Sequence, residues 1–389
     1  MSIFSKPKEK RELTIVFDIG SSSVGGEIFY AEKSGIPKII YSIREPILLE
    51  QEVDFDRLLS STVKALETVA NKIYMMKLGA LKKTFCVLSS LWYTSQIRTI
   101  CLEKNIPFTF TLKLADSLIQ KEISIFTEEY SGKNPDTDIR PIELKNIKTM
   151  MNGYAVLYPL GQTTKELEMT IFVSMVHGQV LEKFEQTIGR YFNPTNIKFS
   201  SFAMASFSVA RDIFAHQKNF ILVDVGGEVT DISLVKNDAL CESISFPMGR
   251  NFIIRKVASI LKCSMDEARS IVSLHESGNA SESVERKIKP IMNKFKIEWV
   301  ENFQEALNDF TGNVSIYGTI LMTAEKDLAD FFSEAVRTGK FSDNNSTESK
   351  LKVVALNTKT LHGFAVLEKN TVRDSALIIE SIYINSFLR

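Results

Sequence analysis

Two stretches of this chain share one arrangement, an apolar run that ends on an aspartate and is followed by glycine. The first is LTIVFDIGSSSVGGEIFYA (13–31) and the second is FILVDVGGEVTDISLV (220–235). In each, the acid ends a buried strand, small residues form a turn, and apolar–polar alternation predicts a second strand. A third strand and an amphipathic helix follow each copy, at 37–43 and 55–76 in the first and at 240–246 and 251–262 in the second. This duplication predicts two lobes built on related sheets.

The paired turns also predict a ligand site between the lobes. Asp18 and Asp224 end their strands at the sheet edge, where a carboxylate can hold Mg²⁺, usually through water. The glycines and serines that follow let backbone N–H groups approach an anion closely. Two such loops, facing each other across a cleft, would bind the phosphates of a nucleotide from both sides. One Asp-Gly turn is common in hairpins, so the prediction depends on the repetition.

The segment between the two copies has a different pattern of predicted strands and helices. From 83 to 192, short strands flank two predicted helices, at 113–126 and 179–191, and a polar loop lies between those helices. We interpret this segment as a small α+β insert. After the second copy we predict a helix at 266–275 and a long amphipathic helix that Pro290 kinks or begins. Further predictions are a strand at 314–317, a surface loop at 339–350 and helices at 360–367 and 372–388.

Composition excludes several classes of protein. The chain has 389 residues, enough for two or more domains, and Lys plus Arg equals Asp plus Glu at 47 each, unlike a basic nucleic-acid binder. The four cysteines show no CxxC spacing and the four histidines no HExxH, so we expect no zinc site. The longest apolar runs are too short to cross a bilayer, and the N-terminus lacks the apolar region of a secretory signal.

The sequence resembles the actin-like ATPases, with FDIGSSS similar to their first phosphate loop and VDVGGEVTDISLV to their second. Within that superfamily it is most similar to the FtsA/PilM family of bacterial cell division and type IV pilus assembly. Further stretches carry the resemblance. The segment IKTMMNGYAVLYPLGQTTKELEMTIFVS resembles part of their inserted SHS2 domain, SFPMGRNFIIRKVASIL and SMDEARSIVSLHESG resemble the helices after the second loop, and NVSIYGTILM resembles the adenosine strand.

The resemblance implies an actin-like fold, two RNase H-like domains around a nucleotide cleft with an SHS2-type insert, and a site for ATP and Mg²⁺. It implies subdomains 1A (11–80, 195–217 and 371–389), 1C (81–194), 2A (218–262 and 312–370) and 2B (263–311). Asp18 and Asp224 would hold the metal. The residues expected to bind the nucleotide are Asp18, Gly20, Ser21, Ser22, Ser23, Asp224, Gly226, Gly227, Glu228, Val229, Thr230, Gly249, Gly318 and Thr319. No catalytic residue is identified.

The chain departs from the family pattern at several of these positions. Glu228 stands where the second phosphate loop usually has a glycine, and a carboxylate there repels phosphate unless a metal or a cation intervenes. Replacing Glu228 by glycine is therefore expected to strengthen binding. Arg269 and Val272 stand where an acid and a base often grip the ribose, and Ile320 stands in the adenosine loop. These changes leave two interpretations open: the site still binds ATP weakly, with at most weak ATPase activity, or the site has degenerated and the fold is kept as a scaffold.

Three functions are compatible with these features. The first is an FtsA-like scaffold that recruits the division machinery at the inner face of the bacterial membrane. The second is a PilM-like cytoplasmic component of pilus assembly. The third is a small-molecule kinase on the same fold, which needs a general-base carboxylate. For the scaffold we expect division or pilus proteins as partners, self-association into filaments, no nucleic acid, and a cytoplasmic location without membrane insertion. The last helix, 372–388, carries two acids and one arginine, so we interpret it as a core helix and not as a membrane anchor.

Overall fold

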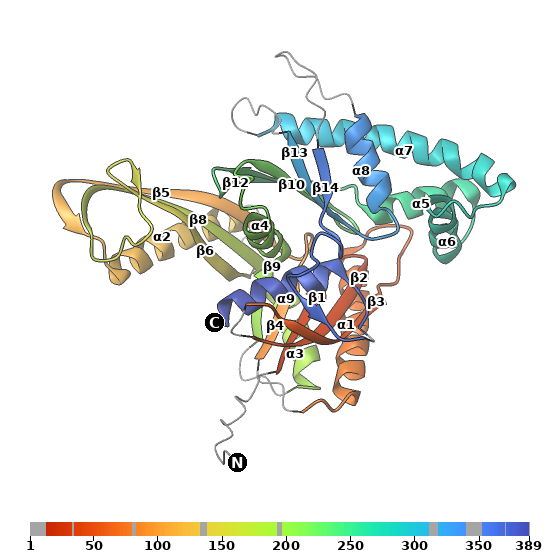
Figure 1. Cartoon of the computed structure of the whole chain (residues 1–389), viewed down its shortest axis with the longest axis horizontal. Helices are drawn as coiled ribbons and strands as arrows, with labels where there is room; N and C mark the ends of the chain where they lie inside the picture. The colour runs from red at the N-terminus through yellow and green to blue at the C-terminus, as the bar shows by residue number, and fades with distance from the viewer. Residues whose placement is uncertain are drawn as a thin grey trace, which may run out of the picture.

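Figure 1 shows two lobes and an elongated insert in the computed structural model of the chain. The structure describes residues 13–32, 35–79, 83–132, 138–192, 197–310, 318–339, 352–369 and 371–388. No helix in these ranges is long and apolar enough to span a membrane. The predicted strand at 314–317 and nearly all of the predicted loop at 339–350 lie outside the described residues.

The first lobe is built on a six-stranded sheet. Its order is β15 (Val366–Leu367), β3 (Lys38–Pro46), β2 (Ser23–Tyr30), β1 (Leu13–Ile19), β4 (Lys83–Leu88) and β9 (Ile197–Ser201). The first three strands along the chain are antiparallel neighbours, and β4 runs parallel to β1. Side chains alternate between the two faces of β1, so Ile15 and Phe17 pack with α1 (Phe55–Met75) and α3 (Gly178–Gly189). Val16 packs on the other face, with α4 (Phe202–Ile213) and α9 (Ser375–Phe387).

The second lobe repeats this order. Its sheet runs β12 (Ala239–Phe246), β11 (Thr230–Lys236), β10 (Phe220–Val225), β13 (Thr319–Ala324) and β14 (Lys352–Ala355). As in the first lobe, the first three strands are antiparallel neighbours and β13 runs parallel to β10. The helices of this lobe are α5 (Arg250–Leu261), α6 (Met265–Glu276), α7 (Glu282–Asn308) and α8 (Ala329–Thr338). The structure therefore confirms the predicted duplication.

The insert is a four-stranded antiparallel sheet with one helix. Its order is β5 (Thr94–Thr109), β8 (Thr163–His177), β6 (Ile139–Met151) and β7 (Tyr154–Ala155), and its core also contains side chains of α2 (Leu112–Ser131). Asn152 and Gly153 both have positive φ values and join β6 to β7, so this Asn-Gly pair forms a tight hairpin turn. The identification of the insert as an SHS2 module stays a prediction.

Several elements differ from the sequence predictions. Because β4 pairs with β1 and α3 packs on α1, both belong to the first lobe, so the insert is narrower than residues 81–194. The strand pair β15–β3 likewise joins the end of the predicted 312–370 segment to the first lobe. No helix forms at 360–367, where turns lead into β15. Pro290 lies inside α7 and does not begin it.

The last helix is a core element, as the sequence predicted. Leu377, Ile379 and Ile384 of α9 are fully buried. They belong to a hydrophobic cluster that also contains Phe29 of the first sheet and Leu222 of the second. Asp374 caps the helix by accepting from the N–H groups of residues 376 and 377 at 3.1 and 3.2 Å. The helix thus packs against the face of the first sheet that looks towards the second lobe.

Candidate nucleotide cleft

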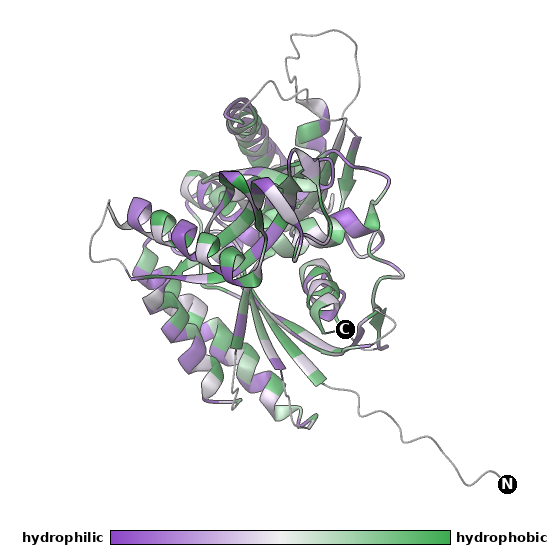
Figure 2. Cartoon of the chain, turned by 90° about the vertical axis from the view of Figure 1, so that its left-hand side faces the viewer, coloured by the Kyte–Doolittle hydropathy of each residue, from purple (hydrophilic) through white to green (hydrophobic). Residues whose placement is uncertain are grey.

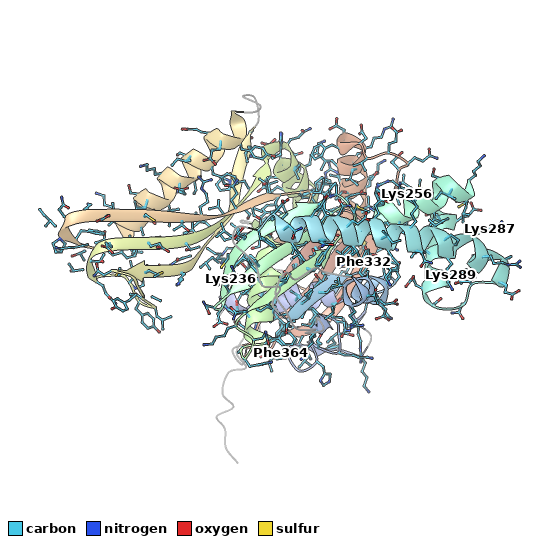
Figure 3. All side chains as sticks on the ribbon, turned by 90° about the horizontal axis from the view of Figure 1, so that it is seen from above. Lys236, Lys256, Lys287, Lys289, Phe332 and Phe364 are labelled. Carbon is cyan, nitrogen blue, oxygen red and sulfur yellow. The ribbon has the colours of Figure 1, made fainter. Side chains whose placement is uncertain are left out.

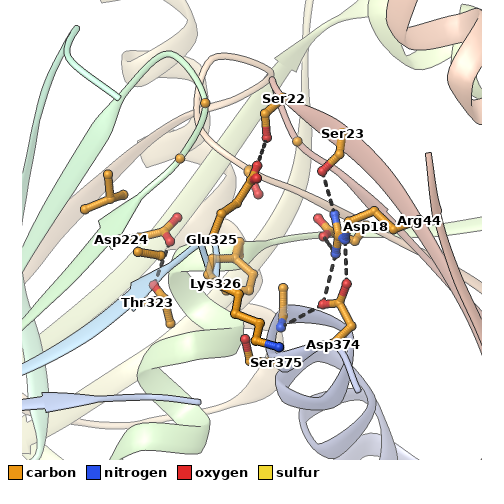
Figure 4. A pocket seen from close by; sticks show the side chains of 18 of the residues that line it. Asp18, Ser22, Ser23, Arg44, Asp224, Thr323, Glu325, Lys326, Asp374 and Ser375 are labelled. Carbon is orange, nitrogen blue, oxygen red and sulfur yellow. Dashed lines mark hydrogen bonds and ion pairs between the residues drawn. The ribbon is translucent and has the colours of Figure 1, made fainter. Parts of the chain in front are cut away.

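A cavity of about 360 Å³ lies between the lobes (Figure 4), a size that suits a small-molecule ligand. Both duplicated turns line it, together with the start of α9 and the segment after β13. The predicted residues that line it are Asp18, Gly20, Ser21, Ser22, Ser23, Asp224, Gly226 and Gly227. The two loops that the sequence singled out therefore face a common space.

The remaining predicted residues do not line this cavity. Four of them lie on the side of the second turn that faces away from the cavity: Glu228, Val229, Thr230 and Gly249. There the Thr230 hydroxyl donates to the carbonyl oxygen of Met248 at 2.7 Å. Gly318 and Thr319 lie at the opposite end of β13, because Thr323, not Thr319, is paired with Asp224 in the sheet register.

Sequence reasoning placed the cleft end of this strand at Gly318 and so missed the residues that line the cavity. These are Thr323, Ala324, Glu325, Lys326 and Asp327. They line the cavity because β13 runs parallel to β10, which brings the residues after Ala324 to the sheet edge where Asp224 lies.

Two glycines are required where the loops meet. A Cβ atom on Gly227 would lie 2.7 Å from the backbone nitrogen of Ser22, and one on Gly249 would lie 2.4 Å from the carbonyl oxygens of Gly226 and Gly227. The hydroxyl of Ser21 also accepts from the Glu228 N–H at 3.0 Å, which joins the first turn to the second. The loops are thus packed against each other directly.

Glu228 faces away from the cavity, which corrects the expectation that it repels phosphate. Arg255 donates to both of its carboxylate oxygens at 2.6 and 2.7 Å, and Asn251 donates to one of them at 2.7 Å. Arg255 also donates from Nε to the carbonyl oxygen of Glu50 in the first lobe. Glu228 is therefore a buried, neutralised member of the contact between the lobes.

Arg44 on β3 occupies the first lobe's side of the cavity, and the sequence did not single it out. Its Nη2 lies 2.6 Å from Asp18 and 3.1 Å from Asp374, and its Nη1 lies 2.9 Å from the Ser23 hydroxyl (Figure 4). Its Nε donates to Asp374 as well. Burial opposes the charge on Arg44, but Asp374 and Asp18 raise its pKa well above the ordinary value. Burial likewise raises the pKa of Asp374, yet Arg44 outweighs burial and holds it below its usual range.

The second predicted metal ligand has a different environment. Burial, with the charge of Asp231, raises the pKa of Asp224 to about 8. Thr323 donates to its carboxylate at 2.6 Å. No group of three or more His, Cys, Asp or Glu side chains among the described residues is arranged to hold a metal ion. Asp18 is bound to the Arg44 guanidinium and Asp224 accepts from the Thr323 hydroxyl, so each predicted metal ligand already has a partner in the chain.

Two more acids are buried between β2 and α9. Burial raises the pKa of Glu27 and of Glu380 well above the ordinary glutamate value. The Ser381 hydroxyl donates to one oxygen of Glu27, and the other oxygen has no partner among the described residues. Both acids are fully buried, and this burial favours their neutral, protonated forms.

The cations at the opposite side of the cavity differ in their partners. Arg250 on α5 lies 3.1 Å from Glu325 and 2.5 Å from Asp327, so these two acids share one guanidinium. Lys326 and Arg373 also line the cavity, yet neither forms an ion pair within the described part of the chain. Figure 4 shows Lys326 extending towards the start of α9.

Comparison with known proteins supports the fold. No protein-family model matches the chain, and no curated protein is similar to it in sequence. A solved PilM–PilN type IV pilus biogenesis complex is similar in structure, with a TM-score of 0.60, 13% identity, and coverage of 97% of this chain and 98% of that one. MreB 5 of Spiroplasma citri bound to AMPPNP is similar with a TM-score of 0.49 and 8% identity, over 98% of each chain. The chain has the actin-like ATPase fold.

Proposed function

We propose that this chain is an actin-fold scaffold that binds partner proteins through its insert and keeps weak nucleotide binding in the cleft. Its place is the inner face of the bacterial membrane, reached through those partners. ATP with Mg²⁺ stays the ligand that the sequence predicts for the cleft. A small-molecule kinase stays the alternative of another class, but fold alone does not favour it.

An apolar surface at the free end of the insert carries this proposal. This insert tip is formed by residues 104–112 and 152–165, and Figure 2 looks at the chain from that side. The main chain of Phe110 bonds to that of Gly161 and Gln162, so the two segments lie together. Leu157 is 90% exposed and Tyr158 is 84% exposed. Exposed apolar side chains at the tip are Ile106, Leu112, Tyr154, Leu157, Tyr158 and Leu160. Grouped exposed apolar residues mark interaction surfaces in soluble proteins.

Two settings for such a scaffold remain as proposals. In the first it recruits the bacterial division machinery, as the resemblance to FtsA implies. In the second it belongs to type IV pilus assembly, and the similar solved structure is a complex of PilM with PilN. That similarity, at 13% identity, favours the pilus setting as the alternative to test first.

The test is partner capture from the native cell with wild type and an insert-tip variant. Leu157→Ser with Tyr158→Ser removes two exposed side chains, so we expect an unchanged melting temperature and at least about a tenfold loss of the specific partner, since apolar anchors dominate interface energy. The matched control is Val53→Ser with Met75→Ser, two exposed apolar residues on the first lobe.

Four results are informative. Recovery of the tubulin-like division protein that depends on the tip supports the division setting. Recovery of pilus membrane proteins that depends on the tip supports the pilus setting. Equal capture by wild type and the tip variant contradicts recruitment through the insert, and robust phosphorylation of a small molecule would replace the scaffold with a kinase.

A further inference from the structure

Arg44 lies where the duplicated turns lead one to expect a metal ion. Asp18 on β1 is paired with Gly25 on β2, and Gly25 is paired with Arg44 on β3, so the three residues form a row across the sheet. A Cβ atom on Gly25 would lie 2.9 Å from Arg44 Nη2. The missing side chain at Gly25 lets the guanidinium reach across β2 to the carboxylate that ends β1.

This guanidinium uses the carboxylate that Mg²⁺ would need. Four described hydrogen bonds, to Asp18, to the two oxygens of Asp374 and to Ser23, leave one N–H of Arg44 without a partner among the described residues. The planar guanidinium of Arg44 is held in one orientation by the carboxylates of Asp18 and Asp374. The guanidinium of Arg44 therefore occupies the position on Asp18 that a divalent ion would need.

The turns contribute further donors. The backbone N–H groups of Ser21, Ser22 and Gly227 make no hydrogen bond to another described residue, although Ser21 and Gly227 are buried. Buried backbone donors are almost always paired, so these groups point to an acceptor that the chain does not provide. Adjacent N–H groups of this kind bind phosphate oxygens.

The cavity mouth supplies two cations. Lys326 follows β13 and Arg373 precedes α9, so they approach the cavity from different lobes, and neither has an ion-pair partner among the described residues. The acids beside them, Glu325 and Asp327, are bound by Arg250. Charge-assisted contacts to phosphate are thus available from Lys326 and Arg373 without breaking an existing ion pair.

We propose that the cleft binds a phosphate-bearing ligand such as a nucleoside triphosphate without a divalent cation, with Arg44 occupying Asp18 and with Lys326, Arg373 and the backbone N–H groups of the turns as direct contacts. This inference rests on the nucleotide-binding part of the proposed function and specifies its mode. A divalent ion competes with Arg44 for Asp18 and with the protein's cations for the phosphates. Free ATP is accordingly the tighter ligand and Mg²⁺-ATP the weaker one.

Calorimetric titration of ATP into the full chain, in EDTA and in excess Mg²⁺, tests this. We expect binding in EDTA and weaker binding in Mg²⁺. Lys326→Ala and Arg373→Ala should each weaken binding in EDTA by about tenfold, the effect of losing one charge-assisted hydrogen bond. The control is Lys289→Ala on the distant helix α7 (Figure 3), an exposed lysine that also lacks a described ion pair. It should bind like wild type.

Arg44→Gln provides a second readout, because it frees Asp18 and Asp374. In a folded variant, checked by circular dichroism, binding in EDTA should fall and Mg²⁺ should now strengthen binding. A wild type that binds ATP only with Mg²⁺, or that binds none in either buffer, overturns the inference. So does Lys326→Ala or Arg373→Ala binding like wild type. Partner capture through the insert tip uses another surface, so these failures would leave the scaffold proposal standing.

Discussion

At the residue scale, Glu228 shows how a side chain that the loop pattern disfavours becomes part of the structure. Only 7% of Glu228 is exposed, and its carboxylate is held by Arg255 and Asn251. Asn251 also donates to the carbonyl oxygen of Ser21 in the first lobe. A glycine at 228 would remove the partner of a mostly buried guanidinium and leave that charge uncompensated. The change is expected to loosen the contact between the turns, not to restore a phosphate loop.

This yields a stability prediction for Glu228→Ala. We expect the free energy of unfolding to fall by roughly 3 kcal/mol, the lower end for breaking a buried pair, because Arg255 keeps some exposure. Denaturant unfolding measures it, and Glu334→Ala, which breaks an exposed pair with Lys296, serves as the control with a loss of at most about 1 kcal/mol. A double variant with Arg255→Met should recover much of the loss. Equal stability of Glu228→Ala and wild type would show that the ion pair is not structural.

At the element scale, α9 packs on β2 around two buried acids, Glu27 and Glu380, whose pKa values are raised. Glu27 accepts a hydrogen bond from Ser381 of α9. The charges of Asp374 and Arg44 act on both Glu27 and Glu380. Four acids share one guanidinium in this layer, so an added negative charge has no compensating partner. The raised pKa values of Glu27 and Glu380 favour their protonated forms, so ionisation of either acid should weaken the packing of α9 on β2.

The second prediction concerns pH. The pKa of Glu27 is raised in the folded chain, so its stabilising contribution is complete below the unfolded value of 4.5 and declines as pH rises towards the folded value. Glu27→Gln removes this dependence, so its melting temperature relative to wild type should rise steadily from pH 5 to pH 8. Thermal melts across this range measure the difference. A difference that stays constant with pH would mean that Glu27 is not neutral in the fold.

The same scale shows what could be predicted from the sequence. The duplicated sheets and α9 were predictable because long apolar runs and repeated turns are local signals. The strand β6 was not, because half of its residues are partly exposed and its apolar side chains are spaced irregularly. Helix α8 was missed as well, although its ten residues have a clear apolar face. Arg44 was missed because its role comes from the sheet register that lines it up with Gly25 and Asp18, and a single sequence does not give that register.

At the scale of the whole molecule, the two lobes share one hydrophobic cluster. It contains Val16 and Phe29 of the first sheet, Leu222 and Leu321 of the second, and Phe207 of α4. The buried face of α9 belongs to the same cluster. We expect a core that continues across both sheets to couple their unfolding, whereas chains of this length commonly unfold in separate steps.

The third prediction follows from this shared core. Ile379→Ala on α9 removes a fully buried side chain and should cost roughly 2–5 kcal/mol, as buried Ile→Ala changes do. If the lobes unfold together, differential scanning calorimetry should show the main transition shifting as one peak. Hydrogen exchange should then speed up in β10 of the second lobe as well as in β1. Ser386→Ala, an exposed position on the same helix, is the control and should leave both unchanged. A separate transition, or β10 amides that keep wild-type protection while β1 loses it, would show that the cluster joins the lobes without coupling them.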